Sequence, residues 1–154
     1  MRFFAVFIFI IYSQFSFAQY VDTKTLTANN GLISNNIQAS LVDSDGNLWL
    51  GSRAGLSVKN GNSFKNVPQA TTYKFNNIYD IIEDPNKAKW IAGYGQGILY
   101  FNKQNTKLIN EKIGLVNNNV RSLFYLDDKI YVGTLNGISI ISTKDFSIIN
   151  PKFT

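Results

Sequence analysis

Apolar and polar residues alternate along this chain in short runs that are separated by turn residues. Between residues 30 and 68 the runs cover 37–42, 48–52, 56–59 and 63–67. Alternation with a period of two is typical of β-strands, and no apolar stripe at a spacing of 3.6 persists long enough to predict a helix. The pattern therefore predicts an all-β fold.

Asp-Gly and Asn-Gly pairs stand between these runs, at Asp45-Gly46 and Asn60-Gly61. Both pairs tolerate the positive φ that tight hairpin turns require, so they predict antiparallel hairpins. Four short antiparallel strands in about forty residues is the size of one β-propeller blade.

The whole pattern occurs three times. Trp49, Trp90 and Tyr131 are each 41 positions apart. We expect each ring to pack between neighbouring blades, and the small residue two positions later to leave room where strands crowd. These small residues are Gly51, Ala92 and Gly133, and the Asn pairs that precede each copy are Asn35-Asn36, Asn76-Asn77 and Asn118-Asn119. Asp43, Asp84 and Asp127 are predicted to mark the turn before each aromatic strand.

The repeat predicts an incomplete ring of about three four-stranded blades, because propellers typically contain four to eight. We expect the chain to be a piece of a longer protein or a truncated product; self-association that completes a ring is the alternative. The predicted segments are a signal peptide at 1–18, a lead-in or outer strand at 19–29, blades at 30–68, 69–110 and 111–150, and a short tail at 151–154.

The first residues have the composition of a signal peptide. Arg2 precedes an apolar run over 3–12, and Ser16 and Ala18 are the small residues that signal peptidase requires. The run is shorter than the ~20 residues of a membrane span. Cleavage near Ala18 would place the chain in the periplasm or outside the cell, without later membrane insertion; an uncleaved anchor is the alternative.

Composition narrows the chemistry. The chain has no histidine and no cysteine, which removes Ser-His-Asp catalysis, cysteine-based zinc sites and a phosphoacceptor histidine. We expect no catalytic residues, no metal and no cofactor. The formal net charge of +5 comes from scattered lysines without a basic stripe, so we expect no binding of nucleic acid.

Residues 31–37 (GLISNNI) and 43–52 (DSDGNLWLGS) resemble the two-component regulator propeller repeat. The third copy fits nearly as well, while the second departs at 84–87 (DPNK), where the first copy has Asp-Gly. The resemblance implies the periplasmic sensor region of a sensor histidine kinase or hybrid two-component system. Many such regions respond to glycan-derived ligands, and their partners are further blades and a kinase region.

Loops from the starts of the first strands and from the turns between second and third strands should meet on one face. Amides, an arginine and a tyrosine suit an oligosaccharide or another small polar ligand. The alternative is that the asparagines bind their own backbone in turns. The candidate ligand-binding residues are Arg53, Tyr94, Gln96, Asn136, Asn36, Asn77 and Asn119.

Three other motifs are interpreted as turns. Residues 43–47 lack the spacing of a calcium loop and are predicted to form an Asx turn. The glycine-rich stretch 93–97 precedes a strand, whereas a phosphate cradle needs a helix. Asp127 and Asp128 are predicted to lie in a solvated turn.

The sequence thus predicts a non-catalytic, ligand-sensing propeller that feeds a two-component relay. A secreted or surface propeller that acts as a protein-interaction scaffold is the alternative. A fragment of a propeller-fold carbohydrate-active enzyme is the third.

Overall fold

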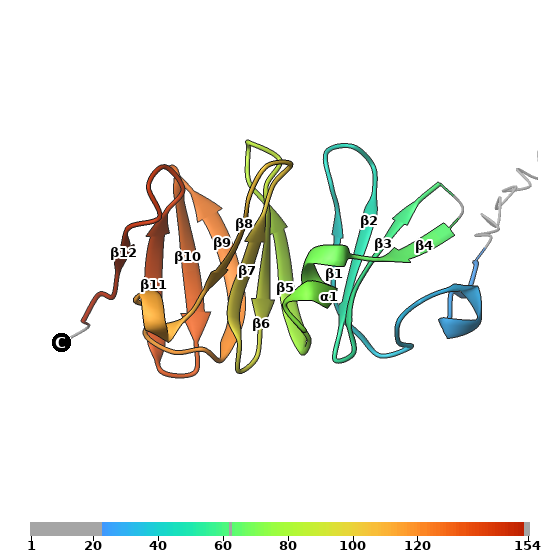
Figure 1. The fold of residues 1–154 in the computed structure, drawn as a ribbon, viewed down its shortest axis with the longest axis horizontal. Coiled ribbons are helices and arrows are strands. Elements are labelled where there is room, and N and C mark those ends of the chain that lie inside the picture. Colours follow the sequence, from blue (N-terminus) through green and yellow to red (C-terminus); the bar gives the residue numbers. More distant parts are fainter. Residues whose placement is uncertain (1–22, 62, 153–154) are drawn as a thin grey trace, which may run out of the picture.

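The computed structural model describes residues 23–61 and 63–152, which fold into three four-stranded antiparallel sheets standing side by side (Figure 1). Each sheet is ordered as its strands follow in the sequence, so each is a meander. The row of sheets does not close on itself, and the first and third lie at opposite ends. This confirms the predicted all-β fold of propeller blades in an incomplete ring.

The strands of each blade are short. The first blade holds β1 (Ile37–Val42), β2 (Leu48–Ser52), β3 (Gly55–Asn60) and β4 (Ser63–Asn66). The second holds β5 (Ile78–Glu83), β6 (Lys89–Gly93), β7 (Gly97–Phe101) and β8 (Thr106–Ile109). The third holds β9 (Val120–Leu126), β10 (Lys129–Thr134), β11 (Gly137–Ser142) and β12 (Ile148–Ile149).

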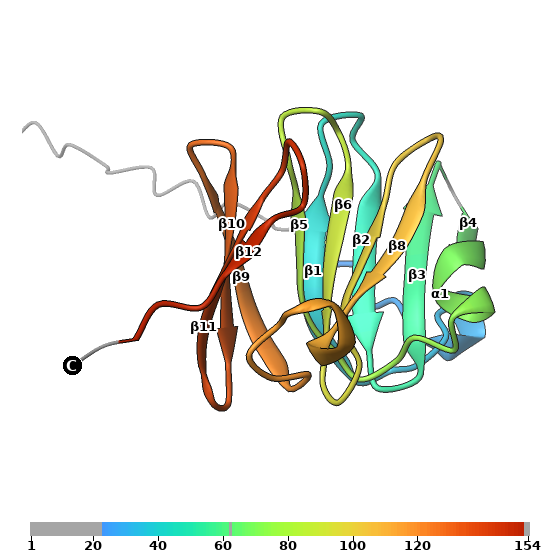
Figure 2. The same cartoon turned by 60° about the vertical axis from the view of Figure 1, so that its left-hand side comes forward.

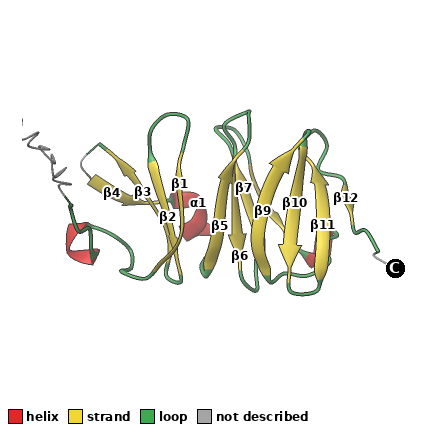
Figure 3. Ribbon diagram, turned by 180° about the vertical axis from the view of Figure 1, so that it is seen from behind, coloured by secondary structure: helices red, strands yellow, loops and turns green. Residues whose placement is uncertain are grey.

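Helical turns occur only in connecting segments of the described chain (Figure 3). They are the 3₁₀ turns η1 (Ala28–Asn30) and η2 (Glu111–Ile113) and the helix α1 (Pro68–Thr72), which lies beside β3 and β4 (Figure 2). The sequence did not predict α1, because five residues are too few to show a helical period. Proline at its first position needs no backbone N–H donor and favours a helix start.

The predicted signal peptide lies outside the described residues, as do the first residues of the predicted outer strand. Residues 23–27 of the predicted lead-in or outer strand have no regular secondary structure and lead directly into η1. No helix in the described part of the chain is long and apolar enough to cross a membrane.

The turns before the aromatic strands show how different residues give one geometry. In the first blade the Asp43 N–H donates to the Asn47 carbonyl at 3.0 Å, and Gly46 has a φ of 79°. In the second blade the Asp84 N–H donates to Ala88 at the same distance, and Lys87 takes the left-handed position with a φ of 62°. The DPNK segment therefore keeps the turn despite its different sequence.

The third blade departs at this turn. Leu126 pairs with Lys129, which leaves Asp127 and Asp128 as a two-residue turn with φ values of 47° and 57°. Positive φ at both central residues is the signature of a type I′ hairpin. Asp127 thus lies in the turn itself, and Leu126 occupies the place that Asp43 and Asp84 hold in the other blades.

The three aromatic residues occupy equivalent places in their sheets. Each pairs with the inner strand on one side and the third strand on the other. Trp90 is fully buried between the second and third blades, whereas Tyr131 is half-buried. The Trp49 ring meets the Phe101 ring of the second blade at 5.8 Å. Interdigitated apolar side chains fill both junctions between blades.

The small residues two positions later differ in what surrounds them. A Cβ added at Gly51 would lie 2.3 Å from Ile78 Cγ2 of the second blade, so only glycine lets the two sheets approach. Ala92 is fully buried at the next junction. At Gly133 an added Cβ would instead meet the Ser122 hydroxyl of the same sheet. Crowding between blades therefore requires glycine at the first junction.

Candidate ligand-binding groove

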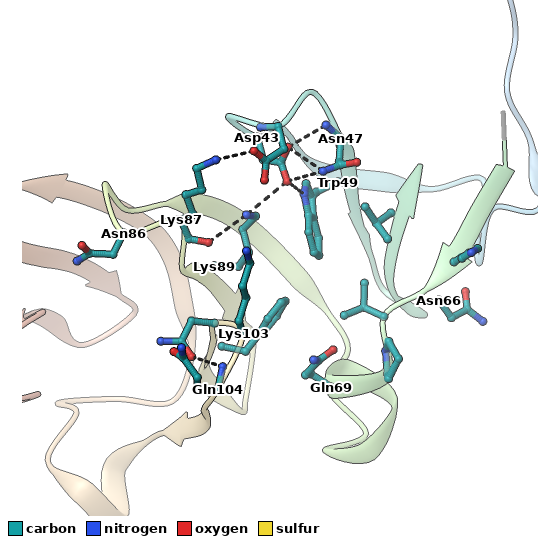
Figure 4. Close-up of a pocket in the computed structure, with 17 residues that line it drawn as sticks. Asp43, Asn47, Trp49, Asn66, Gln69, Asn86, Lys87, Lys89, Lys103 and Gln104 are labelled. Carbon is teal, nitrogen blue, oxygen red and sulfur yellow. Dashed lines mark hydrogen bonds and ion pairs between the residues drawn. The ribbon is translucent and has the colours of Figure 1, made fainter. Parts of the chain in front are cut away.

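A groove of about 700 Å³ lies between the first and second blades (Figure 4). Its walls come from the β1–β2 turn, the segment joining β4 to α1, the β5–β6 turn and the β7–β8 turn. Trp49 and Phe101 give it apolar surface, at ring centroids 5.8 Å apart and tilted by 46°. Val58, Val67 and Pro68 add to this apolar surface. The rest of the lining is polar and consists of the carboxylates of Asp43 and Asp45, the amides of Asn47, Asn66, Gln69, Asn86, Asn102 and Gln104, and the ammonium groups of Lys65, Lys87, Lys89 and Lys103.

A buried carboxylate orients the tryptophan of the groove. Asp43 Oδ2 accepts the Trp49 indole N–H at 2.8 Å, and Asp43 Oδ1 accepts the backbone N–H groups of Asp45 and Asn47. Residues 43–47 thus form an Asx turn that also fixes an aromatic ring. Asp84 holds Trp90 in the same way at 3.0 Å.

A buried ion cluster joins the two blades beside the groove. The Lys89 ammonium lies 3.0 Å from Glu83 Oε2 and 3.4 Å from Asp43 Oδ2 of the first blade. Glu83 also accepts the Ser44 N–H of the first blade at 3.2 Å. Lys89 is only 6% exposed and stands 5.1 Å from the centroid of the Trp49 ring. Charges taken out of water are costly unless paired, so the cluster fixes the relative position of the blades.

The same contacts set the acidity of both carboxyl groups. Burial raises the pKa of Asp43, but the hydrogen bonds from Trp49 and Asn47 and the charge of Lys89 outweigh it and lower the pKa well below its usual range. Burial likewise raises the pKa of Glu83, and the hydrogen bonds from Ser44 and the charge of Lys89 bring it below its ordinary value. Both side chains are therefore ionised at neutral pH.

Acid is expected to weaken the junction between these blades. A carboxyl group whose pKa is lowered by folding contributes stability above its unfolded pKa of about 4, and this stability is lost as the pH falls through the lowered value. Urea unfolding at several values between about pH 5 and pH 2.5 should show the loss in the natural chain and a smaller loss in Glu83→Gln. Equal pH dependence of the two chains would contradict the role given to Glu83.

The structure places the predicted ligand residues at the opposite ends of the strands. Backbone hydrogen bonds there hold loops within one blade: Tyr94 N–H donates to the Asn77 carbonyl and Leu135 N–H to the Asn119 carbonyl. Asn77 has a φ of 47°, which favours asparagine. Arg53 accepts the Asn77 N–H through its carbonyl, and Asn136 N–H donates to the Thr134 hydroxyl.

Amide side chains on this face also hold loops. The Gln96 side chain accepts the Asn76 N–H at 2.8 Å and donates to the Lys74 carbonyl at 2.9 Å. Asn35 and Asn118 accept the N–H groups of Ala28 and Glu111, and so fix the two 3₁₀ turns. Asn36 N–H donates to the Ser34 hydroxyl. Of the residues predicted to bind a ligand, Gln96 thus uses its amide to hold a loop, and Tyr94 is half-buried.

The groove was not found from the sequence, although one signal points to it. Lys89 occupies a strand position that is apolar in the other two copies, Leu48 and Ile130. Its cross-strand partner is Glu83, where the first copy has Val42. A charged pair that replaces an apolar pair in one copy of a repeat indicates a local electrostatic role.

Comparison with known proteins decides the type of repeat. Residues 31–54 match the family model described as "Two component regulator propeller". Over these residues the first blade is similar to a regulator propeller repeat. This confirms the resemblance drawn from residues 31–37 and 43–52. The match covers the loop before β1, the Asx turn and the Trp49 strand of the regulator propeller repeat.

Solved structures extend the likeness to the whole row of blades. The extracellular domain of the putative hybrid two component system BT3049 from B. thetaiotaomicron superposes with a TM-score of 0.73 at 22% identity, covering 84% of this chain and 18% of that one. The corresponding domain of BT4673 gives 0.70 at 19% identity, over 88% and 19%. PorZ, a surface component of the type-IX secretion system of Porphyromonas gingivalis, gives 0.53 at 23%, over 66% and 17%.

The chain thus spans less than a fifth of the length of these structures. At such identities the likeness shows the propeller fold. No curated protein sequence matches the chain.

Proposed function

We propose that this chain is the extracytoplasmic ligand-sensing part of a two-component sensor, and that its groove binds an oligosaccharide. The observation that carries the proposal is the regulator propeller repeat at residues 31–54, in a fold shared with extracellular domains of hybrid two-component systems. Signalling would then require further blades and a kinase region. The predicted signal peptide, cleaved near Ala18, would deliver the chain to the periplasm or cell surface.

The groove suits a sugar for chemical reasons. Trp49 and Phe101 provide apolar surface for the C–H face of a ring, while amides and ammonium groups on the walls can bind hydroxyl groups. Gln69 on α1 and Gln104 in the β7–β8 turn both line the groove, so one ligand can contact both. The groove lies beside the junction that the Lys89 cluster fixes. A bound ligand could therefore change the relative position of the first and second blades.

The proposed role is binding without turnover. The buried carboxylate on the groove, Asp43, already accepts hydrogen bonds from Trp49 and Asn47 and lies beside Lys89. Its pKa is lowered, so it is unsuited to act as a general acid near neutral pH. Asp43 therefore does not fit the general acid that a glycosidase requires.

The double variant Gln69→Ala/Gln104→Ala is expected to weaken binding of a glycan selected on an array by about tenfold, since each lost hydrogen bond is worth about 0.5–1.5 kcal/mol. Calorimetric titration gives the affinity, and urea unfolding should show unchanged stability. Asn136→Ala, which removes an exposed amide at the opposite ends of the strands, is the matched control. Binding lost in the control and kept in the double variant would transfer the site to the face predicted from the sequence.

A protein-interaction scaffold is the second candidate, favoured by the outer face of the third blade. Phe124 is 61% exposed and Ile149 65% exposed, on a sheet face that no described residue covers. Absence of glycan binding together with stable capture of a defined surface protein would favour this candidate.

A further inference from the structure

The first strand of every blade contains one extra residue near its start. In β1 the register passes from Ile37 to Ala39, in β5 from Ile78 to Asp80, and in β9 from Ser122 to Val120. The three strands are neighbours in space, because β1 contacts β5 and β5 contacts β9. The residues at these bulges are Gln38, Tyr79 and Arg121, which we call the bulge row.

Packing explains why the bulge exists. Ile78 and Ile81 both lie against the Cβ direction of Gly51 in the first blade, although residues three apart normally point to opposite faces of a strand. Val120 and Leu123 are likewise both buried in one core cluster. The extra residue of a bulge shifts the alternation by one position, so that residues three apart point to the same face. Bulges also commonly re-aim a side chain beside a binding site. The residues of the bulge row therefore belong to neither core cluster.

Arg121 is held in position by two tyrosines of the second blade. Its guanidinium carbon lies 4.6 Å from the centroid of the Tyr79 ring and 4.9 Å from that of Tyr94, and the two rings are 5.7 Å apart. Tyr94 is itself fixed by its backbone bridge to Asn119. No carboxylate within residues 23–61 and 63–152 forms an ion pair with Arg121. The group is pre-organised, exposed and without an acidic partner there.

Gln38 also has a polar group without a hydrogen-bond partner among the described residues. Its side-chain oxygen is buried and accepts no hydrogen bond from the described residues. A buried amide oxygen without a donor is costly, and native structures rarely keep one without a ligand or water. A hydroxyl group is the kind of donor that would satisfy it.

We propose that the bulge row binds an oligosaccharide that carries carboxylates, that is, a chain containing uronic acids. Arg121 would take a carboxylate through paired N–H donors, Tyr79 and Tyr94 would pack on sugar rings, and Gln38 would accept a hydroxyl. Neighbouring strands present these groups in succession, which suits a linear ligand better than a single sugar. The inference rests on the proposed sensing function only for the general class of ligand, and the bulge row lies at the opposite ends of the strands from the groove.

The test compares acidic oligosaccharides with their neutral forms. Galacturonate, glucuronate-containing and mannuronate oligomers and their methyl esters are titrated calorimetrically into the natural chain, Arg121→Gln and Lys107→Gln. Lys107 is the matched control because its ammonium lies 3.6 Å from the centroid of the Phe146 ring, an exposed cation on an aromatic ring elsewhere. Charge-assisted hydrogen bonds predict a loss of about 10- to 100-fold for Arg121→Gln and less than about twofold for the control.

The outcomes separate this proposal from the groove. Binding of an acidic oligomer that falls with esterification and in Arg121→Gln supports the bulge row. Equal affinity of acid and ester, unchanged affinity in Arg121→Gln, or no binding of any acidic oligomer overturns it. Loss of acidic binding only in Gln69→Ala/Gln104→Ala would also overturn it, yet would leave the proposed function of the groove standing.

Discussion

Trp90→Ala is expected to lower the free energy of unfolding by about 3–5 kcal/mol, the range for removal of a large aromatic side chain from a core. Trp90 is fully buried, and its ring contacts Tyr100 edge to face at 4.8 Å and Phe146 of the third blade at 5.8 Å. The variant also leaves the buried Asp84 carboxylate without its indole donor. Urea unfolding followed by circular dichroism measures the loss.

Tyr131→Ala is the matched comparison, because Tyr131 has the same place in the repeat but is half-buried. Because Tyr131 buries less apolar area, Tyr131→Ala should lower the free energy of unfolding by only about 1–2 kcal/mol. We attribute the stability that each aromatic residue contributes to its packing between blades and not to its position in the strand. Equal losses of unfolding free energy in the two variants would contradict this.

The fold could be read from the sequence because its signals are local. A turn such as Asp45-Gly46 is set by its own residues, and Gly46 indeed takes the positive φ that the pair predicts. The spacing of Trp49, Trp90 and Tyr131 then gives the number of blades. In the third blade the predicted turn position is wrong by one residue. Leu126 pairs with Lys129, so the turn is shorter than the alignment of Asp127 with Asp43 and Asp84 suggested.

The candidate sites could not be read in the same way, because they form between blades. Asp43, Gln69 and Gln104 line one groove, and no local sequence pattern relates them. The bulges are a partial exception: apolar residues three apart, as in Ile78 and Ile81, break strand alternation and could have indicated an extra residue. The sequence did single out Tyr94, but its partners Tyr79 and Arg121 belong to different strands.

Gly51→Ala should destabilise the chain by about 1–3 kcal/mol, although Gly→Ala in a strand without positive φ usually stabilises by limiting the unfolded chain. The added Cβ would lie 2.3 Å from Ile78 Cγ2 and 2.9 Å from Ile78 Cβ, atoms of a fully buried side chain that cannot move aside. Relief requires the second blade to shift away from the first, and this shift would stretch the contacts of Lys89 with Asp43. Urea unfolding measures the stability.

Gly133→Ala is the control at the equivalent position of the third blade. There the nearest atom is the Ser122 hydroxyl oxygen, at 2.3 Å, and rotation of that side chain can remove the overlap. The change in stability should therefore stay within about 1 kcal/mol. If Gly133→Ala lowers the stability as much as Gly51→Ala does, the strand itself requires glycine at this position, independently of the neighbouring blade. A loss confined to Gly51 means that the repeat keeps glycine where one blade presses on the next.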